Sequence, residues 1–547
     1  MSRRSKLFSA LALLAILIFA FYSLGNARQA QTPSGYEDLA KLFREWREFQ
    51  KPKFVNAVPD YSPSAMNEQR QGLKKFQQRL AAIDCKSWPI PQQVDWHLVR
   101  AEMNGLDFDH RVMRPWSRDP CFYVVITSGE PDVPAREGPE IPSVIEPWKM
   151  TFPIPEKDLP AFQAKLQAVP RILEAAKKNL TEDAKDLWFM GIRVKSQEAM
   201  ILENLGKRLK EMHPALVPDV EKAKAAVDDF RGWLETKHAQ MKAPSGIGVE
   251  NYNWYLKNVH LVPYTWQDQV NILNREWERA VSSLKFEEHR NRNLPKLEFP
   301  KTNEEAQARR EEAVKTYMDF LRNDQIFTVP DYMHLPAVRG RLVSGNRPWD
   351  VWNQIELRDY LPMRCHDIHW LEKLRLVNDP SPSPIRSQVP LYNIWDYRSE
   401  GLATAWEELM MNAGLFDKRP RARELIYFLV ALRCARGIGD LRLHSNELNL
   451  DEAIKTAVDR TPFGWLRSDG ETVFTDLRIY LHQPGYGPSY IVGKIHLDKL
   501  IADKSAQMVD SFTLKKFWDE FFTKGVIPIS LIRWEMTGLD DEIKKLW

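Results

Sequence analysis

The chain has 547 residues, of which 44% are hydrophobic and 28% are charged. This balance is typical of a folded protein with a large buried core and excludes a chain that is disordered throughout. Lys and Arg number 77 against 74 Asp and Glu, a net charge of +3. Because no basic stripe stands out, we expect no nucleic-acid partner.

The first element in chain order is a targeting segment. Basic residues in the first six positions precede the apolar run Leu7–Leu24, and Gly25-Asn26-Ala27 offers the small residues of a signal-peptidase site. The run also reaches the length of a membrane span, so residues 1–27 are predicted to be a signal peptide or an N-terminal membrane anchor. In both cases residues 28–547 are expected to be exported, either periplasmic or secreted, because the positive end stays inside.

Most of the remaining chain has the apolar periodicity of helices. Stripes of apolar residues spaced by three and four occur over 69–83 and 157–180 and predict amphipathic helices. Capping residues mark four expected helix starts, at Thr181, Thr265, Thr302 and Thr513. The sequence therefore predicts a mainly α fold, built as one large helical domain over 28–547.

Two regions interrupt the helical pattern. Residues 112–156 are rich in Pro, Trp and Gly and predict a long ordered crossing loop. Residues 325–350 contain short β-branched runs and predict a small β-hairpin.

The four cysteines leave two alternatives open. Cys85 and Cys121 could form a disulfide in an oxidising compartment, or all four cysteines are small buried apolar side chains. No CxxC occurs, which excludes a thiolate zinc knuckle of that kind.

The candidate metal site begins in the stretch 361–376, which has helical spacing. On one helix His366 and His369 are i and i+3 and share a face. Zinc helices more often pair histidines at i and i+4, with a Glu directly after the first as general base. Here Asp367 occupies the base position and Trp370 the i+4 position. Alone, the pattern fits a weak metal motif or a pair of hydrogen-bonded histidines.

A second helix, RSEGLATAWEELMMNAGLF, follows downstream. Glu400 stands near its start and Glu407 lies two turns later on the same face. Thermolysin-type peptidases take their third zinc ligand as a Glu from such a helix. Glu400 has that place, and Glu407 could orient a histidine. The alternative is that Glu400 is an acidic residue favoured at a helix N-terminus by the helix dipole, and that Glu407 is solvated.

Two further blocks contribute polar side chains. His444 ends the strongly helical run that closes with LRLHSNE, and YLHQPGYGPSY predicts a turn that exposes Tyr486 and Tyr490. A tyrosine hydroxyl can stabilise a developing oxyanion. Hydrogen-bonded packing of both tyrosines is the alternative.

In this order the blocks resemble the bacterial domain-of-unknown-function family 885, a group similar to helical zinc peptidases. EGLATAWEEL is similar to that family's EGWALYxEEL, and GDLRLHSNE, YLHQPGYGPSYIVGK and FTLKKFWDEFFTKGVIPISLIRWEM are similar to its closing blocks. A weaker likeness occurs in ENYNWYLKNVHLVPYTW. The resemblance runs over most of the mature chain.

The resemblance implies a gluzincin-like helical fold around a zinc site, with the site region at 361–496. Glu400 matches the glutamate of EGW, and Glu407 matches the later glutamate. His444 matches the family histidine after the Asp, and Tyr490 the tyrosine of the SY pair.

The family's HExxPGHH motif has no clean counterpart. If His369 is aligned with its last histidine, Pro362 and Met363 stand where the first His and Glu belong. If His366-Asp367 is aligned with HE, the PGHH part is missing.

Two functions follow as hypotheses. The first is an extracytoplasmic, peptidase-like zinc hydrolase that acts on a peptide-like substrate. The second is a catalytically degenerate scaffold that binds a peptide or an envelope protein, as the altered first motif suggests. The residues expected in the hydrolase are the zinc ligands His366, His369 and Glu400, the base Asp367 or Glu407, the oxyanion donor Tyr490, and His444 and Tyr486 as supporting or substrate-contacting groups.

Overall fold

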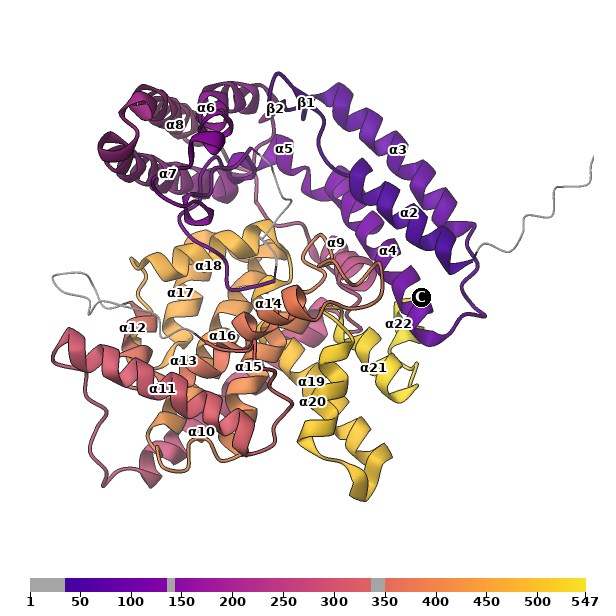
Figure 1. Cartoon of the computed structure of the whole chain (residues 1–547), viewed down its shortest axis with the longest axis vertical. Coiled ribbons are helices and arrows are strands. Elements are labelled where there is room, and N and C mark those ends of the chain that lie inside the picture. The colour runs from indigo at the N-terminus through magenta and orange to yellow at the C-terminus, as the bar shows by residue number, and fades with distance from the viewer. Residues whose placement is uncertain (1–34, 135–142, 336–349) are drawn as a thin grey trace, which may run out of the picture.

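The computed structural model describes residues 35–134, 143–335 and 350–547, and helices dominate this part of the chain (Figure 1). Within it, the one regular sheet is the antiparallel pair β1 (Phe54–Val55) and β2 (Val58–Pro59). The predicted mainly α fold is confirmed. The apolar run 7–24 lies outside the described residues, among which no helix is both long and apolar enough to cross a membrane.

An N-terminal layer of three helices occupies the upper right of Figure 1. These are α2 (Tyr36–Phe49), α3 (Pro63–Ala81) and α4 (Ile90–Phe108). The stripe predicted over 69–83 lies on α3 and just beyond it, and Leu73, Leu80 and Ile83 are buried. Burial of this stripe against α2 and α4 holds the layer together, since apolar area removed from water is the main driving force.

The predicted crossing region contains short helical turns connected by irregular chain. They are the π-helical turn η1 (Asp109–Met113), α5 (Pro115–Arg118) and the 3-10 turns η2 (Pro120–Tyr123), η3 (Pro147–Lys149) and η4 (Glu156–Asp158).

Three long helices follow and form the unit at the upper left of Figure 1: α6 (Leu159–Asn179), α7 (Lys185–Met212) and, after η5 (Pro214–Leu216), α8 (Val217–His238). The stripe predicted over 157–180 is buried on α6. The helix start predicted at Thr181 is wrong. Helix α7 begins at Lys185, and the Thr181 and Glu182 N–H groups donate to the Ser117 carbonyl.

The body of the molecule is made of helices that follow α8, from Val249 onward. In order they are α9 (Val249–Tyr255), the π-helical turn η6 (Leu256–His260), α10 (Trp266–Arg290), α11 (Asn303–Asn323), α12 (Val351–Glu356), α13 (Leu361–His366), α14 (Ile368–Asn378), α15 (Asp396–Asn412), α16 (Ala422–His444), α17 (Leu450–Arg460), η7 (Pro462–Gly464), α18 (Glu471–His482) and α19 (Tyr486–Met508). Thr265 and Thr302 cap α10 and α11 as predicted.

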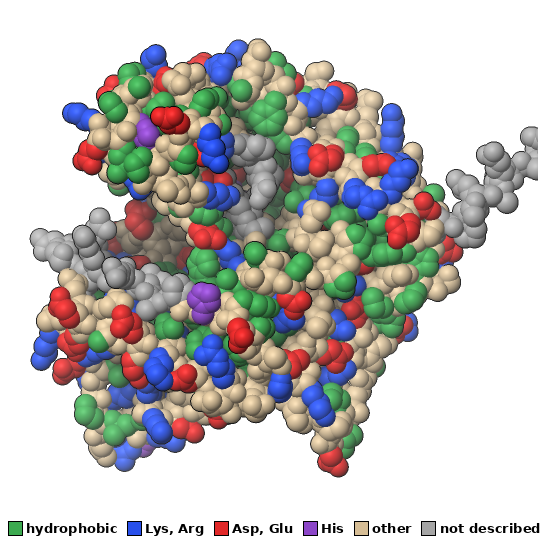
Figure 2. Space-filling model, in the orientation of Figure 1, with side chains coloured by type: hydrophobic (Ala, Val, Ile, Leu, Met, Phe, Trp, Pro, Cys, Tyr) green, Lys and Arg blue, Asp and Glu red, His purple; other side chains and the backbone are tan. Residues whose placement is uncertain are grey.

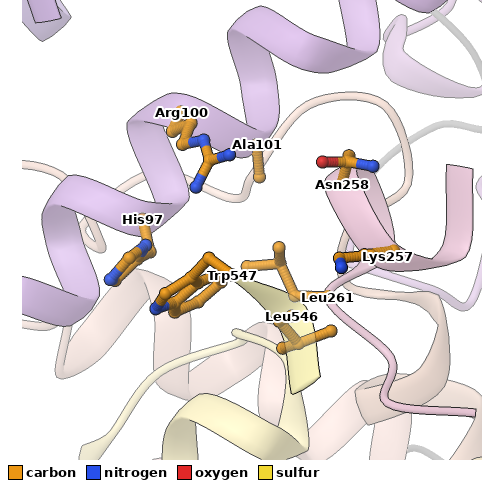
Figure 3. A pocket seen from close by; sticks show the side chains of 8 residues that line it. All are labelled: His97, Arg100, Ala101, Lys257, Asn258, Leu261, Leu546 and Trp547. Carbon is orange, nitrogen blue, oxygen red and sulfur yellow. The ribbon is translucent and has the colours of Figure 1, made fainter. Parts of the chain in front are cut away.

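The chain ends against the N-terminal layer. After η8 (Val509–Ser511) come α20 (Leu514–Thr523), α21 (Ile529–Thr537) and α22 (Ile543–Leu546), and Thr513 caps α20 as predicted. Figure 3 shows the terminal Trp547 beside His97 of α4. Their rings stack with centroids 3.6 Å apart, which joins the two ends of the fold.

Two remaining expectations concern a hairpin and a disulfide. Residues 325–335 contain no strand, and residues 336–349 of the predicted 325–350 hairpin lie outside the described residues, so the hairpin stays a prediction. Within the described part, the backbone N–H and hydroxyl of Thr328 donate to Asp519 of α20. The disulfide alternative is wrong, because Cys85 and Cys121 are both free, and all four cysteines are buried.

The surface in Figure 2 is hollowed between the α6–α8 unit and the body below it. On this face Lys and Arg side chains are interspersed with Asp and Glu, and no large patch of one sign is visible. This agrees with the near-balanced charge of the sequence.

Candidate metal centre

The histidine segment is not the single helix that its spacing predicts. Helix α13 ends at His366 and α14 begins at Ile368, with Asp367 forming the break between them. The predicted continuous helix over 361–376 is therefore wrong. Even so, the two imidazoles stay together, edge to face, with ring centroids 4.9 Å apart.

Glu400 is brought to these histidines by α15. A glycine follows it in the sequence, and α15 crosses α19 there at backbone contact: a Cβ added at Gly401 would lie 2.5 Å from the Cα of Gly493. Only glycine allows this approach. The crossing places the buried carboxylate of Glu400 between α14 and the start of α19.

Three ligand atoms face one another at this point. Glu400 Oε2 lies 3.2 Å from His369 Nε2 and 4.0 Å from His366 Nε2. One ligand atom from each residue lies within 4.8 Å of the others. In a tetrahedral zinc site with bonds of about 2.1 Å, ligand atoms are about 3.4 Å apart. The observed separations bracket that value, so the three side chains fit a metal ion with small adjustments.

The second oxygen of Glu400 is held from outside the triad. Tyr486 and Tyr490, one turn apart on α19, both donate their hydroxyls to Oε1, the latter over 3.2 Å. Oε2 is thereby left to face the histidines. Tyr486 is buried and Tyr490 is half-buried, so the predicted exposure of both tyrosines is wrong.

Hydrogen bonds and charge set the protonation of the triad. Burial alone would raise the pKa of Glu400, but the bond and charge of His369, together with His366 and Tyr486, lower it to about 2. Burial lowers the pKa of His369, but Glu400 outweighs this effect and raises it above its usual value. Glu400 is therefore an anion at neutral pH, the form that a metal or an imidazolium requires.

Glu407 lies behind His366. Its Oε1 is 3.0 Å from His366 Nδ1, and both of its oxygens accept bonds of 2.7 Å from the guanidinium of Arg433. The carboxylate is fully buried, so the alternative of a solvated Glu407 is wrong. His366 Nδ1 also lies 3.1 Å from Arg433 Nη2, so it faces both members of the ion pair. In the tautomer that donates Nδ1–H to Glu407, the Nε2 lone pair would be free to bind a metal ion.

Asp367 pairs with an arginine from the preceding turn. Its Oδ2 lies 2.7 Å from an Arg364 nitrogen. Burial raises the pKa of Asp367 to about 7, although the charges of Arg364 and His369 oppose this. The Asp367 carboxylate is not among the three ligand atoms that converge.

His444 lies apart from the three converging residues. Its Nε2 donates to the Tyr480 carbonyl over 2.8 Å, and burial lowers its pKa to about 4. One turn earlier on α16, Asp440 accepts a 2.7 Å bond from the Gly487 N–H. The block around His444 thus supports the turn that carries Tyr486 rather than supplying a ligand.

Two neighbouring charged residues were missed from the sequence. Arg433 stands in the apolar run LIYFLVALRCARGIG, and a charge in so apolar a helix is itself a signal of a buried ion pair. Asp132 belongs to the crossing region and acts electrostatically on His369 and Asp367. No sequence pattern connects it to them, because the electrostatic interaction is between distant parts of the chain.

A sequence profile for a bacterial family of unknown function, DUF885, matches residues 50–337 and 376–536. These two ranges make up most of the chain and include Glu400, Glu407 and both tyrosines. The stretch between them, 338–375, contains both His366 and His369. The family pattern is therefore interrupted at the histidine pair. No curated protein matches the chain at a significant level.

Two solved structures are similar to the chain in fold. One is titled a "putative lipoprotein of unknown function" from Shewanella oneidensis, with 15% identity and a TM-score of 0.66 over 92% of this chain and all of that one. The other is a "putative lipoprotein" from Colwellia psychrerythraea, with 14% identity, a TM-score of 0.66, and coverage of 92% and 99%. At this identity the likeness concerns the fold alone.

Proposed function

The chain belongs to the bacterial family DUF885, and we propose that it is a zinc-dependent hydrolase acting on peptide-like substrates outside the cytoplasm. One observation carries the proposal: three ligand atoms, on His366, His369 and Glu400, face one another. A catalytic zinc site has three protein ligands of these types and keeps a fourth position open.

The surrounding bonds favour a metal site over a simple hydrogen-bonded cluster. Ligands in metal sites are oriented through their other polar atoms. Here Glu400 Oε1 accepts from two tyrosines, and His366 Nδ1 lies beside Glu407. His366 Nε2 faces the same carboxylate oxygen at 4.0 Å, too far for a hydrogen bond but compatible with two ligands of one ion after a small shift.

Bound zinc would polarise a carbonyl and lower the pKa of a bound water. The chain's own residues do the rest. Glu407, held by Arg433, orients His366, and the two tyrosines orient Glu400. Asp367 is our candidate to accept and return the proton, because it directly follows His366, the place of the general base in zinc helices, and burial raises its pKa to about 7. Glu407 is unsuited to that role, because both of its oxygens accept bonds from Arg433.

The scaffold hypothesis keeps a specific observation in its favour. The matched family ranges omit 338–375, and the residue directly after His366 is Asp367 rather than a glutamate. A scaffold would keep the hydrogen-bonded His369–Glu400 pair and bind a peptide or envelope protein without hydrolysing it. Export, through a cleaved or retained segment 1–27, belongs to both proposals.

Metal analysis and hydrolysis distinguish the two. The full chain, reconstituted with zinc, is compared with His369→Ala and with His289→Ala, an exposed histidine that serves as the control. The hydrolase proposal expects His369→Ala to lose one equivalent of zinc and chelator-sensitive cleavage of a peptide library, while His289→Ala keeps both. Equal zinc content in the two variants would refute the proposed metal site. Zinc binding without any hydrolysis would favour the scaffold.

A further inference from the structure

A second group of metal-ligating side chains lies outside the triad. Asp119, Cys121 and His482 each offer one ligand atom, and these atoms all lie within 4.8 Å of one another. One Asp119 oxygen accepts from the Cys121 N–H over 2.9 Å, and the other pairs with His482 Nδ1. The group therefore combines a carboxylate, a thiol and an imidazole.

These residues come from two distant parts of the chain. Asp119 and Cys121 belong to the start of η2, in the crossing region, which packs on α7. His482 is the last residue of α18, just before the turn that leads to Tyr486. The group thus lies where the N-terminal half meets the segment that supports Glu400.

The Asp119–His482 ion pair does not explain why a thiol lies beside it. Cys121 is 8% exposed, and among the described residues no hydrogen bond involves its sulfur. Thiols and imidazoles are the ligands that zinc prefers, and a carboxylate completes a common set. One thiolate and one carboxylate would also balance the charge of a divalent ion, which offsets part of the electrostatic cost of burying it.

A thiolate nucleophile is the other use of a Cys beside a His. Reactive cysteines have a lowered pKa and are partly exposed. Burial instead raises the pKa of Cys121 well above its usual value. The thiol of the metal-free chain is therefore neutral at physiological pH and a poor nucleophile. Access for a metal ion remains through His482, whose side chain is 21% exposed.

We propose that Asp119, Cys121 and His482 form a second, structural binding site for a divalent zinc-like ion, which joins the crossing region to the end of α18. The ion would fix the chain immediately before the turn that carries Tyr486. The site is independent of the proposed hydrolase, because none of its ligands belongs to the triad.

Cobalt tests the proposal, because only a sulfur ligand gives a thiolate-to-cobalt charge-transfer band in the near ultraviolet. The full chain, stripped of metal, is titrated with Co²⁺. We expect the band to reach its full intensity when one cobalt ion per chain occupies this site. The band should be lost in Cys121→Ser and in His482→Ala. Cys85→Ser is the matched control, because Cys85 is also 8% exposed, and it should keep the band.

The outcomes separate this site from the triad. His369→Ala should keep the band even if all hydrolysis is lost, since the triad contains no sulfur. No band in the wild type, or a band that persists in Cys121→Ser, overturns the proposal. A band that disappears in Cys365→Ser would also overturn it, by placing the cobalt beside His366. Circular dichroism of metal-free Cys121→Ser and Cys85→Ser should coincide, so that loss of the band is not loss of fold.

Discussion

Glu407 is the residue at which two roles, general base and orienting group, give opposite predictions. It is fully buried, its two oxygens each lie 2.7 Å from Arg433, and its Oε1 lies 3.0 Å from His366 Nδ1. The substitution Glu407→Gln keeps the shape of the side chain and removes its charge. Arg433 then stays buried without the carboxylate that compensates it.

The size of the effect follows from this burial. Removing one partner of a buried ion pair costs about 3–5 kcal/mol, because the remaining charge is uncompensated. His366 also loses the carboxylate that lies 3.0 Å from its Nδ1, and loss of such an orienting group typically lowers metal affinity by about 10–100-fold. That range corresponds to about 1.4–2.7 kcal/mol of zinc-binding free energy.

Two measurements on Glu407→Gln check these values: urea unfolding followed by tryptophan fluorescence, and a zinc titration against a competing chelator. The double variant Glu407→Gln/Arg433→Met should recover part of the unfolding free energy but not the zinc affinity, because it removes the unpaired charge without restoring the orienting carboxylate. Hydrolysis lost at unchanged zinc affinity would refute the reasoning and make Glu407 the general base. Unchanged unfolding free energy would refute the assigned ion pair.

Three further predictions concern the supports of the site. Gly401→Ala places a methyl group 2.5 Å from Gly493 and should lower the free energy of unfolding, measured in urea, by about 1–3 kcal/mol. Gly232→Ala is the control, because a Cβ there meets nothing within 4 Å. Equal effects of the two substitutions would contradict the close crossing of α15 and α19. Tyr490→Phe removes one hydrogen bond to the Glu400 carboxylate. A hydrogen bond to a charged group contributes about 1.5 kcal/mol, so zinc affinity, measured by chelator competition, should fall roughly tenfold. Unchanged affinity would show that Tyr486 alone orients Glu400. Burial lowers the pKa of His444 to about 4. Below about pH 6.5 this histidine therefore takes up a proton in the unfolded chain but not in the folded one. As the pH falls to about 5, the free energy of unfolding should decrease by about 2 kcal/mol. His444→Gln should remove that part of the pH dependence of urea unfolding, and an identical pH profile would show that His444 is not the titrating group.

The predictions from sequence were most successful where the signal is local. Helix stripes such as the one that contains Leu73 and Leu80, and caps such as Thr265, depend on side chains a turn apart, and the structure confirms them. The helix start predicted at Thr181 is wrong: its N–H donates to the distant Ser117 carbonyl, a tertiary contact that local sequence does not show, and α7 begins at Lys185. Helical spacing likewise missed the break at Asp367, since it cannot distinguish one helix from two in close succession.

The candidate site divides in the same way. Residue type and order predicted His366, His369 and Glu400 as a metal-ligand set, because metal ligands come from a small set of side chains with recurring spacing. That they bind a metal stays a prediction. Their convergence was decided by the tertiary structure, through the glycine crossing of α15 and α19 that places Glu400 beside the histidines. The roles of Arg433 behind Glu407 and of Cys121 beside His482 also depend on contacts between distant segments. Such contacts are fixed by packing in three dimensions. The pattern of neighbouring residues in a single sequence does not show which distant segments pack together.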